Sequence, residues 1–140
     1  MECLLGKDGS VEVSTDNKAT WIKVGHAMTV NISNDKAAIV EDDMDSGDIS
    51  QACCGMRTVT GDVTAKLDLD DAGQNAIRNA HNQAGCGQID IRIRPIVRPN
   101  YPEFTGRAIV LTCPLALDAA ATQKFTATFH FNAFAPGIQA

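Results

Sequence analysis

The spacing of hydrophobic residues changes in the middle of the chain, where a strand pattern gives way to a helix pattern. Across residues 58–67, apolar or small side chains alternate with polar ones, which predicts a strand with one solvated face. The alternating positions are Val59, Gly61, Val63, Ala65 and Leu67. Because a strand and a helix follow each other here, we treat residues 56–82 as the centre around which the other elements are arranged.

A short helix is predicted directly after this strand. Asp71 is a typical N-cap residue, and Gln74 three positions later completes a capping box. The apolar stripe at helical spacing consists of Ala72, Ala76, Ile77, Ala80 and Ala84. Gly85 and Gly87 are expected to end the helix. Because Ile77 is the only large side chain of the stripe, we expect the helix to lie close against a sheet.

Alternation with a period of two predicts further strands on both sides of this centre. They cover residues 10–13, 20–33, 89–94, 108–113 and 125–133, with a bend at Gly25 and a break at Asn34 and Asp35. One face of the last strand is expected to be a main wall of the core and contains Phe125, Ala127, Phe129 and Phe131. The predicted fold is mainly β, with about six to eight strands and one flanking α-helix, as a β sandwich or a partly closed barrel.

Residues 34–56 show neither period and form a long irregular segment. Connections within a compact domain are usually about 4–6 residues long, and much longer ones often have a function. We therefore predict an arm between two strands that becomes ordered against a separate surface. A brief strand at residues 37–40 is the only regular element that the pattern allows within it.

Length and composition indicate one domain covering residues 1–140. Of the 140 residues, 44% are hydrophobic and 21% are charged, which suits a globular protein with a single core. The first residues lack a basic start, and no stretch reaches the roughly 18 apolar residues of a membrane span. We therefore expect neither a signal peptide nor a membrane partner.

Negative charge is concentrated in the predicted arm. The formal net charge is −5, and residues 41–48 of the arm contain five acids with no base among them: Glu41, Asp42, Asp43, Asp45 and Asp48. The other 12 of the 17 acids are matched by 12 bases. Four of these bases gather downstream at Arg92, Arg94, Arg98 and Arg107. Arg92 and Arg94 share one face of a predicted strand and form a short basic ladder.

Three interpretations of the Arg92 and Arg94 ladder stay open. It could contact phosphate groups, although an isoelectric point of about 5.0 and few nearby aromatic residues make nucleic-acid binding the weaker reading. It could lie on a solvated face of a sheet. It could also receive the acidic arm of another copy, which would account for both charged segments. Replacing both arginines by glutamate is then expected to impair assembly and leave folding intact.

Candidate catalytic and metal-binding residues do not form a known motif. The acidic cluster lacks the glycine and glutamate spacing of an EF-hand loop, so a solvated loop is favoured over a calcium site. The five cysteines contain no C-x-x-C pair, and His26, His81 and His130 are far apart in sequence. A nucleophile at Cys53 or Cys54 is the least favoured hypothesis. We expect a protein that is not an enzyme and has no metal, cofactor or catalytic residue.

Four short motifs follow one another in a distinctive order: GKDGS at residues 6–10, MTVNIS at 28–33, GDV at 61–63 and DDAGQ at 70–74. Over nearly the whole chain, their order and spacing resemble the major tail tube proteins of tailed bacteriophages. The resemblance implies a β sandwich flanked by one helix. It also implies a structural subunit of the virion tail, which forms hexameric rings that stack into a hollow tube.

Further expectations follow from the resemblance. The long loop after the early strand would contact the adjacent ring or subunit. The lumen would hold the tape-measure protein and later pass DNA without binding it specifically. Assembly in the host bacterial cytoplasm would involve tail terminator or tip proteins. The alternative, drawn from the residues alone, is a β-sandwich binding module that recognises a partner or a carbohydrate through the acidic loop.

Overall fold

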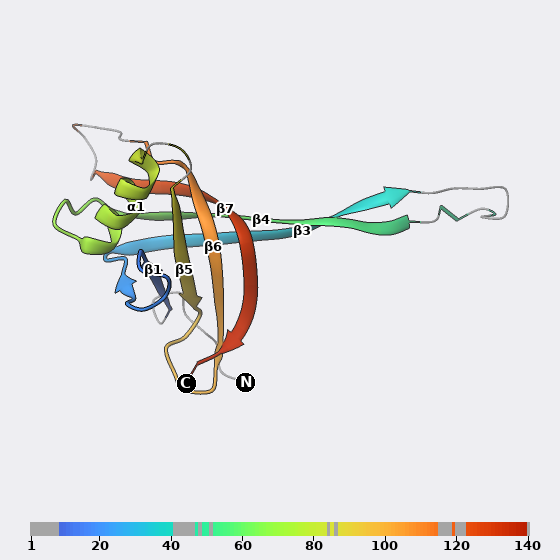
Figure 1. The fold of residues 1–140 in the computed structure, drawn as a ribbon, viewed down its shortest axis with the longest axis horizontal. Coiled ribbons are helices and arrows are strands. Elements are labelled where there is room, and N and C mark those ends of the chain that lie inside the picture. Colours follow the sequence, from blue (N-terminus) through green and yellow to red (C-terminus); the bar gives the residue numbers. More distant parts are fainter. Residues whose placement is uncertain are drawn as a thin grey trace.

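The computed structural model describes residues 9–40, 47, 49–50, 52–83, 85, 87–114, 119 and 123–139. Seven strands and one helix are present in these residues (Figure 1). In chain order they are β1 (Ser10–Ser14), β2 (Ile22–Lys23), β3 (Ala27–Val40), β4 (Ala52–Lys66), α1 (Ala72–Asn82), β5 (Gln88–Arg94), β6 (Pro102–Thr112) and β7 (Lys124–Ile138).

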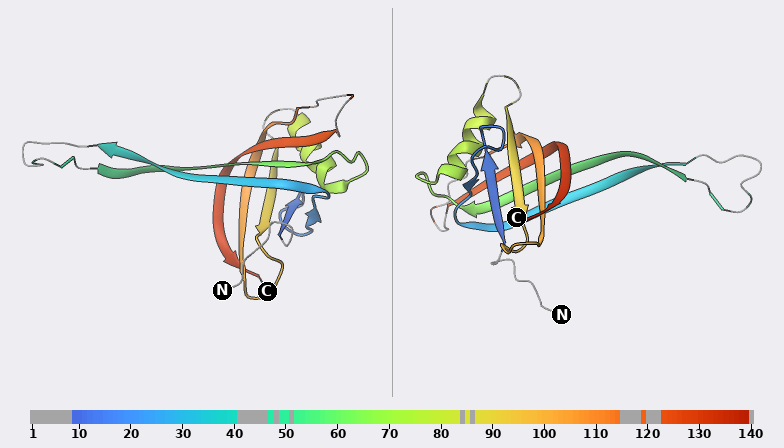
Figure 2. Two further views of the ribbon diagram at one scale, coloured as in Figure 1. Left: turned by 180° about the vertical axis from the view of Figure 1, so that it is seen from behind. Right: turned by 60° about the horizontal axis from the view of Figure 1, so that its bottom comes forward.

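All seven strands belong to one antiparallel sheet in the order β2-β1-β5-β6-β7-β4-β3. The sheet curves strongly, and α1 lies across the concave side near one end (Figures 1 and 2). No ladder joins β2 to β3 in the part of the chain that the structure describes, so the sheet is not closed. The predicted class, mainly β with one flanking helix, is confirmed as a single curved sheet.

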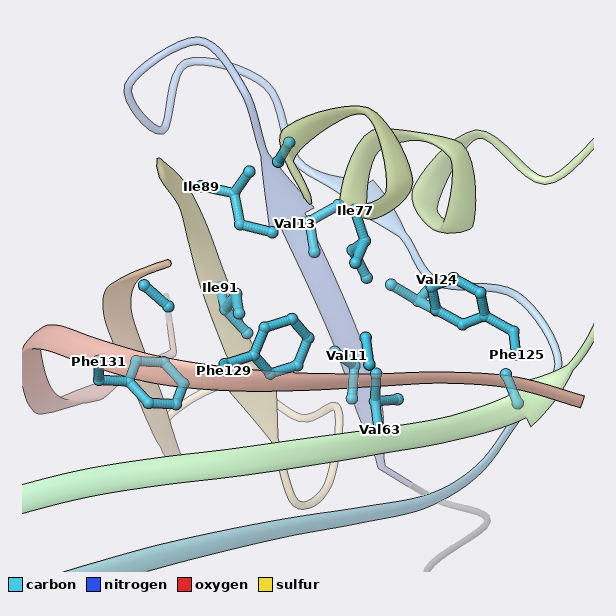
Figure 3. Packing of buried hydrophobic residues seen from close by; sticks show 14 of the residues in the cluster. Val11, Val13, Val24, Val63, Ile77, Ile89, Ile91, Phe125, Phe129 and Phe131 are labelled. Atoms are coloured by element: carbon cyan, nitrogen blue, oxygen red, sulfur yellow. The ribbon is translucent and has the colours of Figure 1, made fainter. Parts of the chain in front are cut away.

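The concave face of the sheet carries the hydrophobic core. Figure 3 shows side chains from β1, β4, β5 and β7 meeting Ile77 of α1. Phe125, Phe129 and Phe131 are 2–5% exposed, which confirms the predicted wall of the core. A Cβ atom on Gly106 would lie 2.5 Å from the Phe131 ring, so the absence of a side chain at this position of β6 makes room for that ring.

The helix begins where it was predicted and lies close to the sheet, as expected. The carboxylate of Asp71 caps it by accepting a hydrogen bond from the backbone N–H of Gln74 at 2.9 Å. The same carboxylate accepts the N–H of Gly25 at 3.1 Å. A Cβ on Gly73 would come within 2.6 Å of the Lys23 carbonyl oxygen, so only glycine permits this approach of α1 to β2.

Two details of the predicted helix are wrong. Gln74 does not complete a capping box, because its fully buried side chain points into the body of the protein. Its Nε2 donates to the carbonyl oxygens of Gly25 (3.1 Å) and Lys66 (2.8 Å), and its Oε1 accepts the N–H of Asp68 (3.1 Å). The helix ends at Asn82, before both glycines, with Gln83 already extended. Gln74 therefore joins three segments instead of closing one helix end.

The predicted boundary of the long early strand is also wrong. The chain turns at Gly25 and His26, and β3 then continues through Asn34 and Asp35 to Val40. Residues 34–40 and 52–56 of the supposed irregular arm are strand, paired from Asn34 with Val59 to Val40 with Ala52. The irregularity is one register shift between Lys36 and Ala38, a bulge that breaks the period without ending the strand.

Replacing Gln74 by alanine is expected to lower the free energy of unfolding by about 2–3 kcal/mol, because a fully buried side chain is removed and three partly buried backbone groups lose their partner. Urea denaturation followed by circular dichroism measures the difference. The matched control is Asn75→Ala, since the Asn75 side chain bonds to near neighbours in the sequence: Nδ2 donates to the Leu69 carbonyl oxygen (2.9 Å) and Oδ1 accepts from Arg78 (2.6 Å). Its loss is expected to cost about 1 kcal/mol. Equal losses for the two variants would contradict the role assigned to Gln74.

Candidate assembly surfaces

The most prominent feature is a two-stranded hairpin, formed by the distal parts of β3 and β4, that projects from the curved sheet (Figures 1 and 2). All residues from Asn31 to Val40 are exposed, although they form a continuous ladder with β4. Arg57 anchors the base of the projection, because its Nη2 donates to the Phe134 carbonyl oxygen of β7 at 3.1 Å. The hairpin is thus regular in its backbone but without cover for its side chains.

Charge is segregated between the two faces of the hairpin. Residues directly opposite each other in an antiparallel pair share a face, so Lys36 and Arg57 lie together on the face that continues the core. Asp35 and Asp62 lie on the other face. Like charges opposite each other are unfavourable in a sheet, and neither Lys36 nor Arg57 forms a salt bridge within the described residues. The basic pair is therefore suited to contact an acidic surface.

The hairpin also exposes apolar side chains near its distal end. Ile39, Val40 and Met56 are 51%, 59% and 85% exposed. The predicted acidic residues Glu41, Asp42, Asp43, Asp45 and Asp48 follow Val40 in the sequence and lie outside the described residues. The described end of the hairpin is thus apolar, and the sequence beyond it is acidic.

The predicted basic ladder is found on β5, but its charges are already paired within the chain. Arg92 forms an ion pair with Glu12 of β1, which stands opposite it in the register. Arg94 lies 3.6 Å from the same carboxylate through Nη1 and donates from Nε to Glu103 of β6 at 3.1 Å. The Arg92 guanidinium also lies 4.5 Å from the centre of the Trp21 ring.

These four charged side chains form a clamp across β1, β5 and β6, and all are only 14–21% exposed. Local sequence patterns do not indicate this clamp, because Glu12 and Glu103 belong to other strands than the two arginines and only the strand order brings the four side chains together. The other two predicted bases lie elsewhere. Arg98 follows β5, with its guanidinium 5.9 Å from the Tyr101 ring centre, and Arg107 stands opposite Asp90 on β6.

Candidate catalytic side chains are not brought together in the described part of the chain. Cys53 and Cys54 are exposed on the distal hairpin. His130 stands opposite Thr60 of β4, six residues from Cys54, or about 20 Å at the usual rise of a strand. Among the described residues no group of three or more His, Cys, Asp or Glu side chains could hold a metal ion, and no helix has the length and hydropathy to cross a membrane.

Among the described residues two groups have shifted pKa values, and neither belongs to a catalytic arrangement. The pKa of Asp16 is lowered by hydrogen bonds from the backbone N–H of Thr20 (2.9 Å) and the hydroxyl of Ser14 (2.8 Å), which fix the turn between β1 and β2. Burial raises the pKa of the Cys113 thiol, an effect partly opposed by the positive charge of Arg78. A raised pKa keeps this thiol protonated and therefore poorly nucleophilic.

Replacing Glu12 by glutamine is expected to lower the free energy of unfolding by about 2 kcal/mol, because Arg92 and Arg94 then repel each other while partly buried. The loss should shrink at high salt, where the repulsion is screened. The control is Asp35→Asn on the exposed hairpin, which is expected to change stability by less than about 0.5 kcal/mol. Thermal and urea unfolding at low and high salt measure both changes. A Glu12→Gln change in the free energy of unfolding as small as that of the control would contradict the clamp.

Comparison with known proteins gives a match in structure alone. No protein-family model matches the chain, and no curated protein matches it in sequence. Its fold is similar to that in a structure of the SPP1 tail tube, with a TM-score of 0.81 and 16% identity over 98% of this chain and 80% of that one. It is also similar to a chain in the C6-symmetric tail of a gene transfer agent particle, with a TM-score of 0.78 and 12% identity over 99% of this chain and 100% of that one.

A third similar structure is that of a chain in the 6-fold symmetrised baseplate of the anti-feeding prophage, with a TM-score of 0.75 and 7% identity over 98% of this chain and 96% of that one. Each of the three likenesses spans almost the whole chain, so the hairpin, the curved sheet and the helix are compared together. The fold of this protein is therefore that of the tail tube subunit, as the resemblance of its sequence motifs predicted.

Proposed function

We propose that this protein is a structural, non-enzymatic subunit of a phage-type tail tube, in which hexameric rings stack into a hollow conduit. The observation that carries the proposal is the exposed β3–β4 hairpin on a body that has this fold. The structures similar to it include six-fold symmetric assemblies. A virion tail assembled in the host bacterial cytoplasm is the setting that this function requires.

The physical argument rests on the hairpin. An isolated two-stranded ribbon is only marginally stable in water, and this one exposes several apolar residues at its end. Within the part of the chain that the structure describes, the outer edge of β3 also leaves a row of backbone N–H and C=O groups without a partner strand over 14 residues. Contacts with other copies would bury the apolar hairpin end and cover the edge of β3. When such contacts join two different surfaces of the same protein, they can close into a ring.

The convex face of β4 and β7 suits a conduit for DNA. Its residues, Thr58, Thr60, Asp62, Thr64, Thr126, Thr128 and His130, alternate with those that face the core. None of these seven residues is a lysine or an arginine. The nearest lysines on the same face, Lys66 and Lys124, lie together at one end of it. A surface without fixed positive charge does not hold phosphate by counterion release. We propose that DNA passes such a lining without specific binding, after release of a tape-measure protein.

The acidic segment remains a proposed docking element, with tail terminator or tip proteins as further partners at the tube ends. The clamp changes how this should be tested, because Arg92→Glu with Arg94→Glu would place added carboxylates beside Glu12 and Glu103 and disturb folding itself. Docking of the segment on Arg92 and Arg94 would also require these arginines to exchange partners. Lys36 and Arg57 of a neighbouring copy offer a second basic surface for it.

Neutralising the acidic segment by Asp42→Asn, Asp43→Asn and Asp45→Asn is expected to weaken assembly and to reduce its sensitivity to salt. The reason is that the removed carboxylates would attract basic residues of another copy across a solvated gap, an attraction that salt screens. Sedimentation of assemblies across a salt series measures the effect. Wild-type assembly at every salt concentration would contradict docking by charge and leave the tube function intact.

Shortening the hairpin tests the proposed function directly. Residues 37–56 are replaced by Asn-Gly, a two-residue turn that joins the opposed pair Lys36 and Arg57 in a regular hairpin. The body is expected to keep its fold and thermal stability, because all core residues lie outside the deleted segment. Rings and tubes, which electron microscopy should show for the wild type, are expected to disappear.

The alternative function, a binding module that recognises a partner or carbohydrate through the acidic loop, predicts another outcome. The wild-type protein would then stay monomeric at all concentrations, even when seeded with tail-tip complexes, and the shortened variant would lose a ligand instead of an assembly. Electron microscopy and light scattering of the wild-type protein therefore separate the two functions.

A further inference from the structure

An apolar groove lies where the curved sheet fails to close. It has a volume of about 380 Å³ and is bordered by the root of β3 on one side and by the ends of β1 and β5 on the other. Its apolar lining includes Val11, Met28, Val30, Ile32, Ile93 and Pro95. Met28 is 54% and Ile32 36% exposed, so large apolar side chains at the border of the groove lie in contact with solvent.

The backbone around the groove is shaped for an additional segment. Met28 is the extra residue of a bulge between Ala27 and Thr29, which turns the start of β3 relative to β4. β3 is the edge of the sheet, so its outer N–H and C=O groups face away from β4 without a partner strand within the described residues. The groove thus offers both apolar side chains and a strand edge.

The hairpin of the same chain cannot fill this groove. Ile32 at the border and Val40 near the hairpin end belong to the same continuous strand, and eight residues of strand separate them by about 26 Å. Folding the end back would break the β3–β4 ladder between Asn34 and Lys36. The exposed apolar residues at the distal end therefore need a surface on a different molecule.

We propose that the groove receives the apolar distal end of the β3–β4 hairpin from a neighbouring copy of this chain. The groove and the distal end of the hairpin are both apolar and both exposed in the single chain. In one chain they are separated by about 26 Å along β3. The contact joins two different surfaces, so each copy inserts its own hairpin into one neighbour and accepts the hairpin of another. Repeated contacts of this kind form either a closed ring or an open helix. The inference rests on the proposed tube function and names the receiving surface within it.

Disulfide trapping in assembled protein tests the proposal. Met28→Cys places a thiol at the groove, and the native Cys53, which stands opposite Ile39 on the distal hairpin, supplies the second thiol. Under mild oxidation, assembled Met28→Cys is expected to form ladders of covalently linked copies on non-reducing gels, several-fold more than the wild type. Ala27→Cys, at the same border, is a second reporter.

Two controls make the result specific. Leu69→Cys places a thiol at another exposed apolar residue outside the groove, since Leu69 is 68% exposed, and is expected to give no ladder above the wild type. Met28→Cys with Cys53→Ser and Cys54→Ser is expected to lose the ladder. Tubes of Met28→Cys and Ala27→Cys that form no ladder would overturn the groove as the receiving surface and leave the tube function standing. A wild-type protein that forms no assembly under any condition would contradict the proposed tube function itself, and with it the docking in the groove.

Discussion

The pairing of β3 with β4 is the interaction on which the rest of the structure depends. At one end, this ladder contributes Val59, Val63 and Ala65 to the core, where they are 0–5% exposed. At the other end, the same ladder continues into solvent as the hairpin. Apart from two local register shifts, the hydrogen bonds between β3 and β4 continue from the core to the described end of the hairpin. The packed part of the two strands therefore sets the direction in which the hairpin projects. The projecting hairpin is in this way held by a rigid body.

The root of this ladder is fixed by polar contacts that do not belong to the sheet. Gln74 and Asp71 together bond to Gly25 and Lys66, which lie at the turn before β3 and at the end of β4. Buried polar groups of this kind are stable only when each has a partner. The helix therefore has a second task besides covering the core: its first turn holds the two strands of the hairpin where they enter the body.

Charged residues are divided between internal and external tasks. Glu12, Arg92, Arg94 and Glu103 form ion pairs with one another across three strands, so their charges are balanced within the chain. Lys36 and Arg57 on the hairpin have no such acidic partner among the described residues. The proposed attraction between copies would therefore be better served by the hairpin than by the ladder of β5. This division also explains how an overall acidic domain can carry a basic surface.

The similar structures share only 7–16% identity with this chain, and yet the fold is kept. A fold of this kind needs alternation along each strand, a cap before the helix and glycine at points of close approach, and many residue choices meet these needs. The likeness therefore extends to the body and the hairpin as backbone, and the side chains on their surfaces are this chain's own.

Local patterns in the sequence determined the strands 10–13, 58–67, 89–94 and 125–133, the helix N-cap at Asp71 and the phenylalanine wall, because each depends on residues that are close in the chain. Only the tertiary structure decided that Gln74 turns inward, that Glu12 neutralises Arg92 and Arg94, and that residues 34–40 and 52–56 pair as strands. In each of these cases the partner belongs to another segment of the fold. A period of two or 3.6 residues reports which face of an element is apolar, but it carries no information about which other element that face, or its edge, will meet.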